Sequence, residues 1–159
     1  MAICYIMVGL PGSGKSTIAA RLIKEGKADR IISTDAIRAE INGNAAIQAN
    51  GKLVFKMAYE RLAIYLNAGF NVVFDATNLT RFYRDNIIKM VRYLKDNHSI
   101  IAISLMKIPI DKCIERDSKR ERVVGEQVIR RMYSNYNILS FKEGFEDIWY
   151  VNEKGELVN

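Results

Sequence analysis

Nine consecutive residues near the N-terminus, "GLPGSGKST" at positions 9–17, have the types and spacing needed to hold a phosphate group. They match the phosphate-binding loop pattern G-x-x-x-x-G-K-[ST]. Glycines let consecutive backbone N–H groups wrap closely around an anion at a helix N-terminus, where the partial positive charge favours it. Lys15 would then reach the β and γ oxygens of ATP or another nucleoside triphosphate, and the Ser16 hydroxyl would bind Mg²⁺. The residues expected to bind the nucleotide here are Gly12, Ser13, Gly14, Lys15, Ser16 and Thr17.

A second stretch, "STDAIR" at 33–38, places a carboxylate and a guanidinium three residues apart, where an apolar run gives way to a helical pattern. In a fold with such a loop, the carboxyl end of the second strand opens beside the bound phosphates. Asp35 would therefore face the γ-phosphate and accept a proton from an attacking hydroxyl group. Arg38, one helical turn on, would hold an anionic group of the acceptor. The alternative makes Asp35 a helix N-cap and Arg38 a surface charge.

A third stretch, "VVFDATNLT" at 72–80, ends an apolar strand on Asp75. A carboxylate in that position holds Mg²⁺ through water or shapes the acceptor pocket. Thr77 and Asn78 add short hydrogen-bonding side chains at the mouth of the site, and we expect all three residues to bind the acceptor. The alternative is that Asp75 caps the segment that follows the strand.

A fourth stretch, residues 113–133, concentrates basic residues between two predicted helices. We expect a lid at about 116–126 that closes over the triphosphate and offsets the charge of the transferring phosphoryl group. Arg116 and Arg120 are four residues apart and could both point inward to the nucleotide. The alternative is solvated surface charge. The basic residues of this run are Arg116, Lys119, Arg120 and Arg122.

The elements that must position these residues alternate along the whole chain. Continuous apolar runs predict strands at 3–8, 30–33, 71–75, 100–106 and 147–151, and helical patterns lie at 15–25, 36–42, 51–68, 80–97, 110–118 and 126–140. Such strands are typical of a parallel sheet covered on both faces, so we predict a three-layer α/β fold of the P-loop NTPase/kinase type, with a mostly parallel sheet of about five strands. The residues after 151 are expected to form a turn and a short tail.

Length and composition limit the class of protein to which the chain can belong. At 159 residues with 49% hydrophobic and 26% charged residues, we expect one globular domain over 1–159, cytoplasmic, with no membrane association and no obligate protein partner. Cys4 and Cys113 lie in apolar patterns and should be buried. The net charge of +6 is compatible with a polyanionic partner without requiring one. Basic residues from Arg81 to Lys95, including Arg84, are expected on a solvated helix face.

Taken in order, the four stretches resemble the kinase domain of the phage and bacterial 5′-hydroxyl polynucleotide kinases over nearly the whole chain. The resemblance implies that Asp35 is the general base for the 5′-hydroxyl group of DNA or RNA and that Arg38 holds the phosphate 3′ to the reacting nucleoside. It also implies that Arg120, helped by Arg116, is the lid arginine, and that Lys15 and Ser16 serve ATP and Mg²⁺. Some members of the family carry the acidic residue one place after Asp75, where this chain has Ala76. The chain has no D-x-D sequence, so we predict no 3′-phosphatase activity.

Two other functions share these features. The zeta-toxin-like and small-molecule kinases have the same loop and an acidic residue after the second strand, but phosphorylate a sugar, nucleotide or similar metabolite. A P-loop switch protein would bind the nucleotide and have no acceptor. The segment 41–62 is expected to line or cover the acceptor pocket through a mobile first half, with Lys52 and Lys56 available to a nucleic-acid strand.

Overall fold

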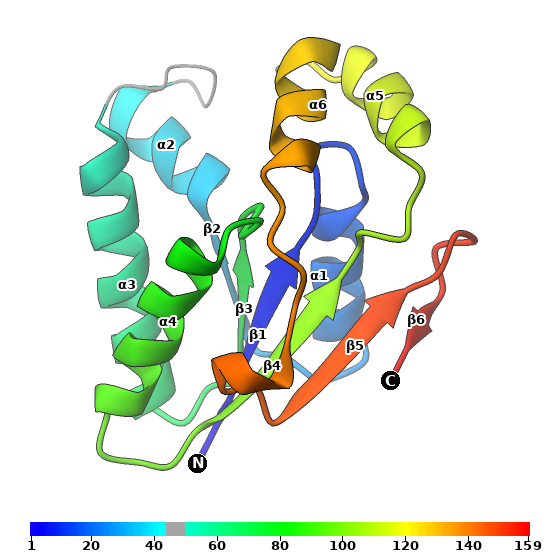
Figure 1. Cartoon of the computed structure of the whole chain (residues 1–159). Coiled ribbons are helices and arrows are strands. Elements are labelled where there is room, and N and C mark those ends of the chain that lie inside the picture. The colour runs from blue at the N-terminus through cyan, green and yellow to red at the C-terminus, as the bar shows by residue number, and fades with distance from the viewer. Residues whose placement is uncertain (44–49) are drawn as a thin grey trace.

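The computed structural model describes residues 1–43 and 50–159, and these form one sheet with helices on both faces (Figure 1). The strand order is β2-β3-β1-β4-β5-β6. The strands are β1 (Ile3–Val8), β2 (Arg30–Ser33), β3 (Val72–Asp75), β4 (Ser99–Ser104), β5 (Asp147–Val151) and β6 (Leu157–Val158). The first five run parallel, so their carboxyl ends share one edge of the sheet. The predicted α/β fold is confirmed.

The helices are α1 (Lys15–Lys24), α2 (Thr34–Asn42), α3 (Gly51–Asn67), α4 (Arg81–Tyr93), α5 (Ile110–Ser118) and α6 (Glu126–Ser134), with a short 3₁₀ helix η1 (Phe141–Glu143). Right-handed crossovers in a sheet of this order put α1 on one face and α3 and α4 on the other. Figure 1 shows α2, α5 and α6 gathered at the carboxyl edge of the strands. The connections that can hold a ligand therefore lie together at that edge.

The core lies between the sheet and its helices. β1 and β4 are buried almost throughout because both faces of these central strands are covered. Cys4, opposite Val72 and Ile100 in the sheet, is a free buried thiol, and so is Cys113 in α5. The predicted burial of both cysteines is confirmed. Among the described residues, no helix combines the length and apolar character needed to cross a membrane.

The sheet has one strand beyond the predicted set. Leu157 and Val158, expected in a short tail, form β6 and pair antiparallel with Val151 and Tyr150. The Asn152 side chain organises the turn by accepting hydrogen bonds from the backbone N–H groups of residues 154 and 156 (3.0 and 2.9 Å). A two-residue strand carries too little periodicity to be detected in the sequence.

Two predicted helices are shorter than expected. The helix predicted at 80–97 ends at Tyr93, because Leu94 adopts an extended backbone. The helix predicted at 126–140 ends at Ser134 and is followed by an irregular segment that leads to η1. The mobile loop expected in the first half of 41–62 falls largely on residues 44–49, which lie outside the described residues.

The prediction that Arg84 lies on a solvated face of α4 is wrong, because the Arg84 side chain is fully buried. Its Nε donates to Glu143 Oε1 at 2.8 Å, and Nη1 donates to the carbonyl oxygens of Asn78 and Leu79 at 3.0 and 2.9 Å. Nη2 donates to the Asn137 carbonyl oxygen at 2.8 Å. Arg84 therefore ties the loop after β3 to the segment after α6, with its buried charge paired as burial requires.

Candidate active site

The phosphate-binding loop connects β1 to α1, as its sequence predicts. Gly12 and Gly14 both have left-handed backbones (φ 78° and 102°), which side chains rarely adopt. A Cβ atom on Gly12 would lie 2.3 Å from the Cys113 carbonyl oxygen, so the loop also packs directly against α5. Gly9 N–H donates to the Thr77 carbonyl oxygen at 3.0 Å, which fixes the loop to the segment after β3.

Lys15 lies inside this loop. Its Nζ donates to the carbonyl oxygens of Gly9 and Leu10 at 3.1 and 2.9 Å. Burial lowers the pKa of Lys15 to about 8, against an opposing attraction from Asp75. A partly buried ammonium beside left-handed glycines at a helix N-terminus is the donor set that a triphosphate needs, so these residues fit a nucleotide.

Ser16 and Asp75 meet next to Lys15. Ser16 Oγ donates to Asp75 Oδ2 at 3.2 Å. Burial raises the pKa of Asp75, and the nearby Lys15 opposes that shift. A hydroxyl group and a carboxylate are the oxygen ligands that Mg²⁺ prefers. The described residues contain no cluster of three or more His, Cys, Asp or Glu side chains suited to a metal, so a Mg²⁺ ion here would take its other ligands from phosphate oxygens and water.

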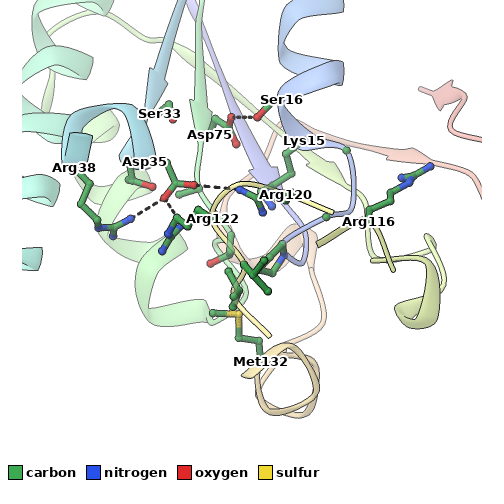
Figure 2. Close-up of a pocket in the computed structure, with 18 of the residues that line it drawn as sticks. Lys15, Ser16, Ser33, Asp35, Arg38, Asp75, Arg116, Arg120, Arg122 and Met132 are labelled. Atoms are coloured by element: carbon green, nitrogen blue, oxygen red, sulfur yellow. Dashed lines mark hydrogen bonds and ion pairs between the residues drawn. The ribbon is translucent and has the colours of Figure 1, made fainter. Parts of the chain in front are cut away.

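Asp35 lies in the first turn of α2, across the pocket from the loop (Figure 2). The helix N-cap is Ser33, whose Oγ accepts a hydrogen bond from the Ala36 N–H at 3.2 Å. The alternative that Asp35 is the N-cap is therefore wrong, because α2 begins at Thr34 rather than at residue 36. The Asp35 side chain remains 44% exposed, so its carboxylate is open to the pocket.

Arginines surround the Asp35 carboxylate. Arg38 Nη1 lies 2.8 Å and Arg122 Nη1 2.9 Å from Oδ1, while Arg120 Nη2 lies 3.9 Å from Oδ2. Figure 2 shows Arg38, Arg120 and Arg122 directed at Asp35 from different sides. Arg38 is 12% exposed and Arg122 is 21% exposed, so both guanidinium groups are held in place around this carboxylate.

Arg116 lies elsewhere in the same pocket. Figure 2 shows its side chain pointing away from the Asp35 group. Its Nη1 is instead close to the phosphate-binding loop, 3.8 Å from the position of a Cβ atom on Gly14. Arg116 and Arg120 both line the pocket, as expected, but they do not share a helix face, because α5 ends at Ser118 and Arg120 belongs to the turn beyond it.

That turn is closed by Asp117, which the sequence argument did not assign. Asp117 is buried and accepts hydrogen bonds from the backbone N–H groups of Val124 (3.1 Å) and Gly125 (2.9 Å). The turn brings Arg122 to Asp35, a pair 87 residues apart in the sequence. The sequence indicates Arg122 only as one member of a basic run. The available signal for Asp117 is an acidic residue inside that run, shortly before the start of α6 at Glu126.

Some predicted residues do not reach the pocket. Asn78 is buried with a left-handed backbone (φ 47°), and its Nδ2 donates to the Met7 carbonyl oxygen at 2.9 Å. The expectation that Asn78 binds the acceptor is therefore wrong in this structure, since its side chain supports β1 instead. The Ser13 side chain is buried as well, and the backbone N–H of Ser13 donates to the Leu10 carbonyl oxygen at 3.1 Å. Thr77 and Thr17 do line the pocket.

The pocket has a volume of about 820 Å³, within the range of small-molecule sites and large enough for a nucleotide with part of an acceptor. Its polar lining comes from the phosphate-binding loop, α2 and the turn after α5. Its apolar lining residues are Phe55, Val123, Val124, Val128 and Met132.

A phosphate-binding loop after β1, a carboxylate after β2 and a basic turn after β4, on a mostly parallel sheet of this order, define the P-loop kinase fold. Residues 5–139 match the AAA_33 family, an AAA domain, and the chain belongs to that family.

Known proteins similar to this chain include an adenylate kinase of Thermococcus sibiricus, 29% identical, with 84% of this chain and 60% of the relative covered. The chain thus spans less than two thirds of that relative. A chain of the Pnkp1/Rnl/Hen1 RNA repair complex has a TM-score of 0.66 at 24% identity, covering 84% of this chain and 43% of its own length.

Two further solved structures share the fold of this chain. A fungal RNA kinase has a TM-score of 0.68 at 17% identity, with 95% of this chain and 38% of that chain covered. A sugar kinase from Janibacter has a TM-score of 0.68 at 18% identity, with 98% and 88% covered. Identities this low show the fold that the chains share.

Proposed function

We propose that this chain is an ATP-dependent polynucleotide 5′-hydroxyl kinase, which transfers the γ-phosphate of ATP to the 5′ end of DNA or RNA. The proposal takes residues 1–159 as a single kinase domain with its lid at 116–126. The observation that carries it is the Asp35 group: a carboxylate across the pocket from the phosphate-binding loop, with Arg38 and Arg122 bound to the same carboxylate oxygen. A base beside an anion-binding pair suits an acceptor whose hydroxyl group lies near a phosphate.

The donor side of the proposed reaction uses the first motif. Backbone N–H groups of the loop bind the β and γ phosphates, and Lys15 leaves its carbonyl partners to neutralise them. Ser16 and Asp75 would hold Mg²⁺, which supplies charge neutralisation at the β and γ oxygens when bound. Arg116, close to Gly14, and Arg120 on the lid would bind the transferring group.

The acceptor side of the reaction uses α2 and the lid. The 5′-hydroxyl group donates its proton to Asp35, most directly to Oδ2, whose nearest arginine contact is the long one to Arg120. The acceptor oxygen then bonds to the γ-phosphorus as the bond to the β–γ bridging oxygen breaks, which releases ADP. Arg38 and Arg122 would exchange Asp35 Oδ1 for the phosphate 3′ to the reacting nucleoside, to which guanidinium groups bind bidentately. Thr77, at the same mouth, would contact the acceptor.

The structurally similar proteins support a polynucleotide acceptor, and they also support a second candidate, a small-molecule acceptor. The RNA repair complex and the fungal RNA kinase share the fold, and an RNA acceptor would suit the basic site. The sugar kinase of Janibacter matches over nearly its whole length, whereas the two RNA-related chains extend well beyond the matched part. That coverage favours the alternative, a small-molecule kinase that phosphorylates a sugar or nucleotide.

The deciding experiment measures transfer from γ-labelled ATP with Mg²⁺ to a 5′-hydroxyl oligonucleotide, the same strand already 5′-phosphorylated, free nucleosides and sugars. We expect label on the 5′-hydroxyl strand alone, lost in Asp35→Asn and kept in Asp111→Asn, a solvent-exposed aspartate of α5. Transfer to a small molecule alone would replace the proposed acceptor with the alternative one. Free phosphate with no labelled acceptor would indicate the switch protein instead.

A further inference from the structure

Three aromatic side chains lie together beside the pocket: Phe55 of α3, and Phe82 and Tyr83 at the start of α4. We call them the aromatic surface. The rings of Phe55 and Tyr83 stack, with centroids 5.3 Å apart and planes 27° from parallel. Phe82 meets Tyr83 edge to face at 5.5 Å. Phe82 is 68% exposed and Tyr83 is 41% exposed, so two large rings face solvent next to each other.

The aromatic surface is anchored in the core. Phe55 contacts Tyr59 with ring centroids 6.0 Å apart, and Tyr59 stacks on Phe74 at 6.1 Å. Phe74 is a fully buried residue of β3, one position before Asp75. A continuous series of rings therefore runs from the sheet to the surface. Rings supported in this way lose little conformational entropy when a ligand stacks on them.

The position of the aromatic surface relates it to the acceptor. Phe55 lines the same pocket as Asp35 and Arg38, so the exposed rings begin where the pocket ends on its α3 side. Exposed basic residues accompany it: Lys52 and Lys56 flank Phe55 on α3, and Arg81 precedes Phe82 on α4. Rings interleaved with cations are the combination that binds single-stranded nucleic acid.

We infer that the aromatic surface binds the bases next to the 5′ end of a single strand by stacking, while the nearby cations contact its backbone phosphates. The inference rests on the proposed function, which puts the 5′-hydroxyl group at Asp35. Stacking is tolerant of sequence because every base has an aromatic face. The enzyme should therefore prefer unpaired 5′ ends and 5′ overhangs to blunt duplex ends, with little preference among bases.

The test uses a 5′-hydroxyl oligonucleotide with the fluorescent base 2-aminopurine at its second position. Stacking on the aromatic surface should quench that fluorescence on binding. The double variant Phe82→Ala/Tyr83→Ala should lose the quenching and raise the KM for the strand by about tenfold or more. Tyr83→Phe should behave as the wild type, since the ring remains. Phe141→Ala is the matched control, because Phe141 is 60% exposed on η1 and does not line the pocket.

An abasic acceptor separates stacking from a folding defect. On a strand that lacks bases at its second and third positions, the wild type and the double variant should have the same KM. The KM for ATP should also be the same in both proteins.

Equal KM values on the natural strand, or strand binding without quenching, would overturn the inference while the proposed function stands. A dimer of the wild type that the double variant loses, with unchanged kinetics, would also overturn it and would assign the surface to a second copy of the chain. If the wild type neither binds nor phosphorylates any 5′-hydroxyl strand, the inference and the proposed function fail together.

Discussion

The side of the pocket proposed to bind the nucleotide, the donor side, and the side proposed to bind the acceptor are built in different ways. The donor side comes mainly from nine consecutive residues, and its contacts outside the loop include those of Ser16 with Asp75 and of Gly12 with Cys113. The acceptor side is assembled from α2, α3 and the turn after α5, and its central contact joins Asp35 to Arg122 across 87 residues. The donor side therefore depends mainly on the backbone conformation of one short segment, whereas the acceptor side depends on how several distant segments pack.

The largest expected effect is a loss of phosphate transfer with unchanged affinity for ATP, from a substitution on the acceptor side. Asp35→Asn keeps the size of the side chain but removes the proposed base, so transfer to the acceptor should fall by between about 10² and 10⁴-fold. Affinity for ATP should change little, because the phosphate-binding loop is untouched. Transfer kinetics and ATP titration calorimetry, with Asp111→Asn as the control, check both parts. An equal loss of ATP binding would contradict the separation of the two sides.

On the donor side, a substitution at Gly12 should weaken the binding of ATP. Gly12→Ala forces a left-handed backbone on alanine and drives its Cβ atom against the Cys113 carbonyl oxygen, at 2.3 Å if nothing moves. Strain and displacement together should weaken ATP binding by about a hundredfold.

Gly26→Ala is the matched control, since Gly26 has a similar φ of 71° and no atom within 4 Å of its added Cβ. It should lower the free energy of unfolding by about 1–2 kcal/mol and leave ATP affinity unchanged. Denaturant unfolding and ATP titration of both variants make the comparison. If Gly12→Ala and Gly26→Ala bind ATP with similar affinity, the phosphate-binding loop tolerates displacement from α5.

Arg122 tests whether the lid belongs to the acceptor side. Arg122→Gln removes one charged donor, and we expect the KM for the acceptor to rise by about tenfold, with the KM for ATP nearly unchanged. Arg130→Gln, a half-exposed arginine of α6, is the control. A fall in the acceptor KM would instead mean that Arg122 blocks Asp35.

The smallest effect concerns pH on the donor side. Burial lowers the pKa of Lys15 to about 8, and a bound triphosphate favours the charged form and raises that pKa. Affinity for ATP should therefore be nearly constant below about pH 7 and weaken as the pH rises through about 8, by about tenfold at pH 9. Calorimetric titration from pH 6.5 to 9 measures the change. Lys15→Arg should remove this pH dependence, because arginine stays protonated; a profile identical to that of the wild type would assign the pH dependence to another group.

Much of the donor side was predictable because its signals are local. The loop, the strands at 3–8, 30–33 and 147–151 and the helix at 110–118 lie at the predicted bounds. Burial of both cysteines followed from apolar runs. On the acceptor side, the sequence predicted the placement of Asp35 and Arg38 after β2, since parallel strands open at a common edge.

Predictions failed where burial depends on distant segments. Arg84 was expected in solvent because helical periodicity separates faces but does not show that η1 supplies Glu143 to cover one arginine. Asn78 was expected at the pocket because it follows a strand, yet its left-handed backbone turns the side chain toward Met7. Arg122 could not be told from its neighbours in the basic run.

The sequence by itself determined the phosphate-binding loop, the alternation of strands and helices, and the edge of the sheet at which the site forms. These depend on backbone conformation and on periodicity over a few residues, which residue types specify locally. Only the tertiary structure decided which arginines reach Asp35, which polar side chains are buried, and how Phe55 comes to stack on Tyr83. Those contacts join segments far apart in the chain, and their geometry is set by packing of the whole core.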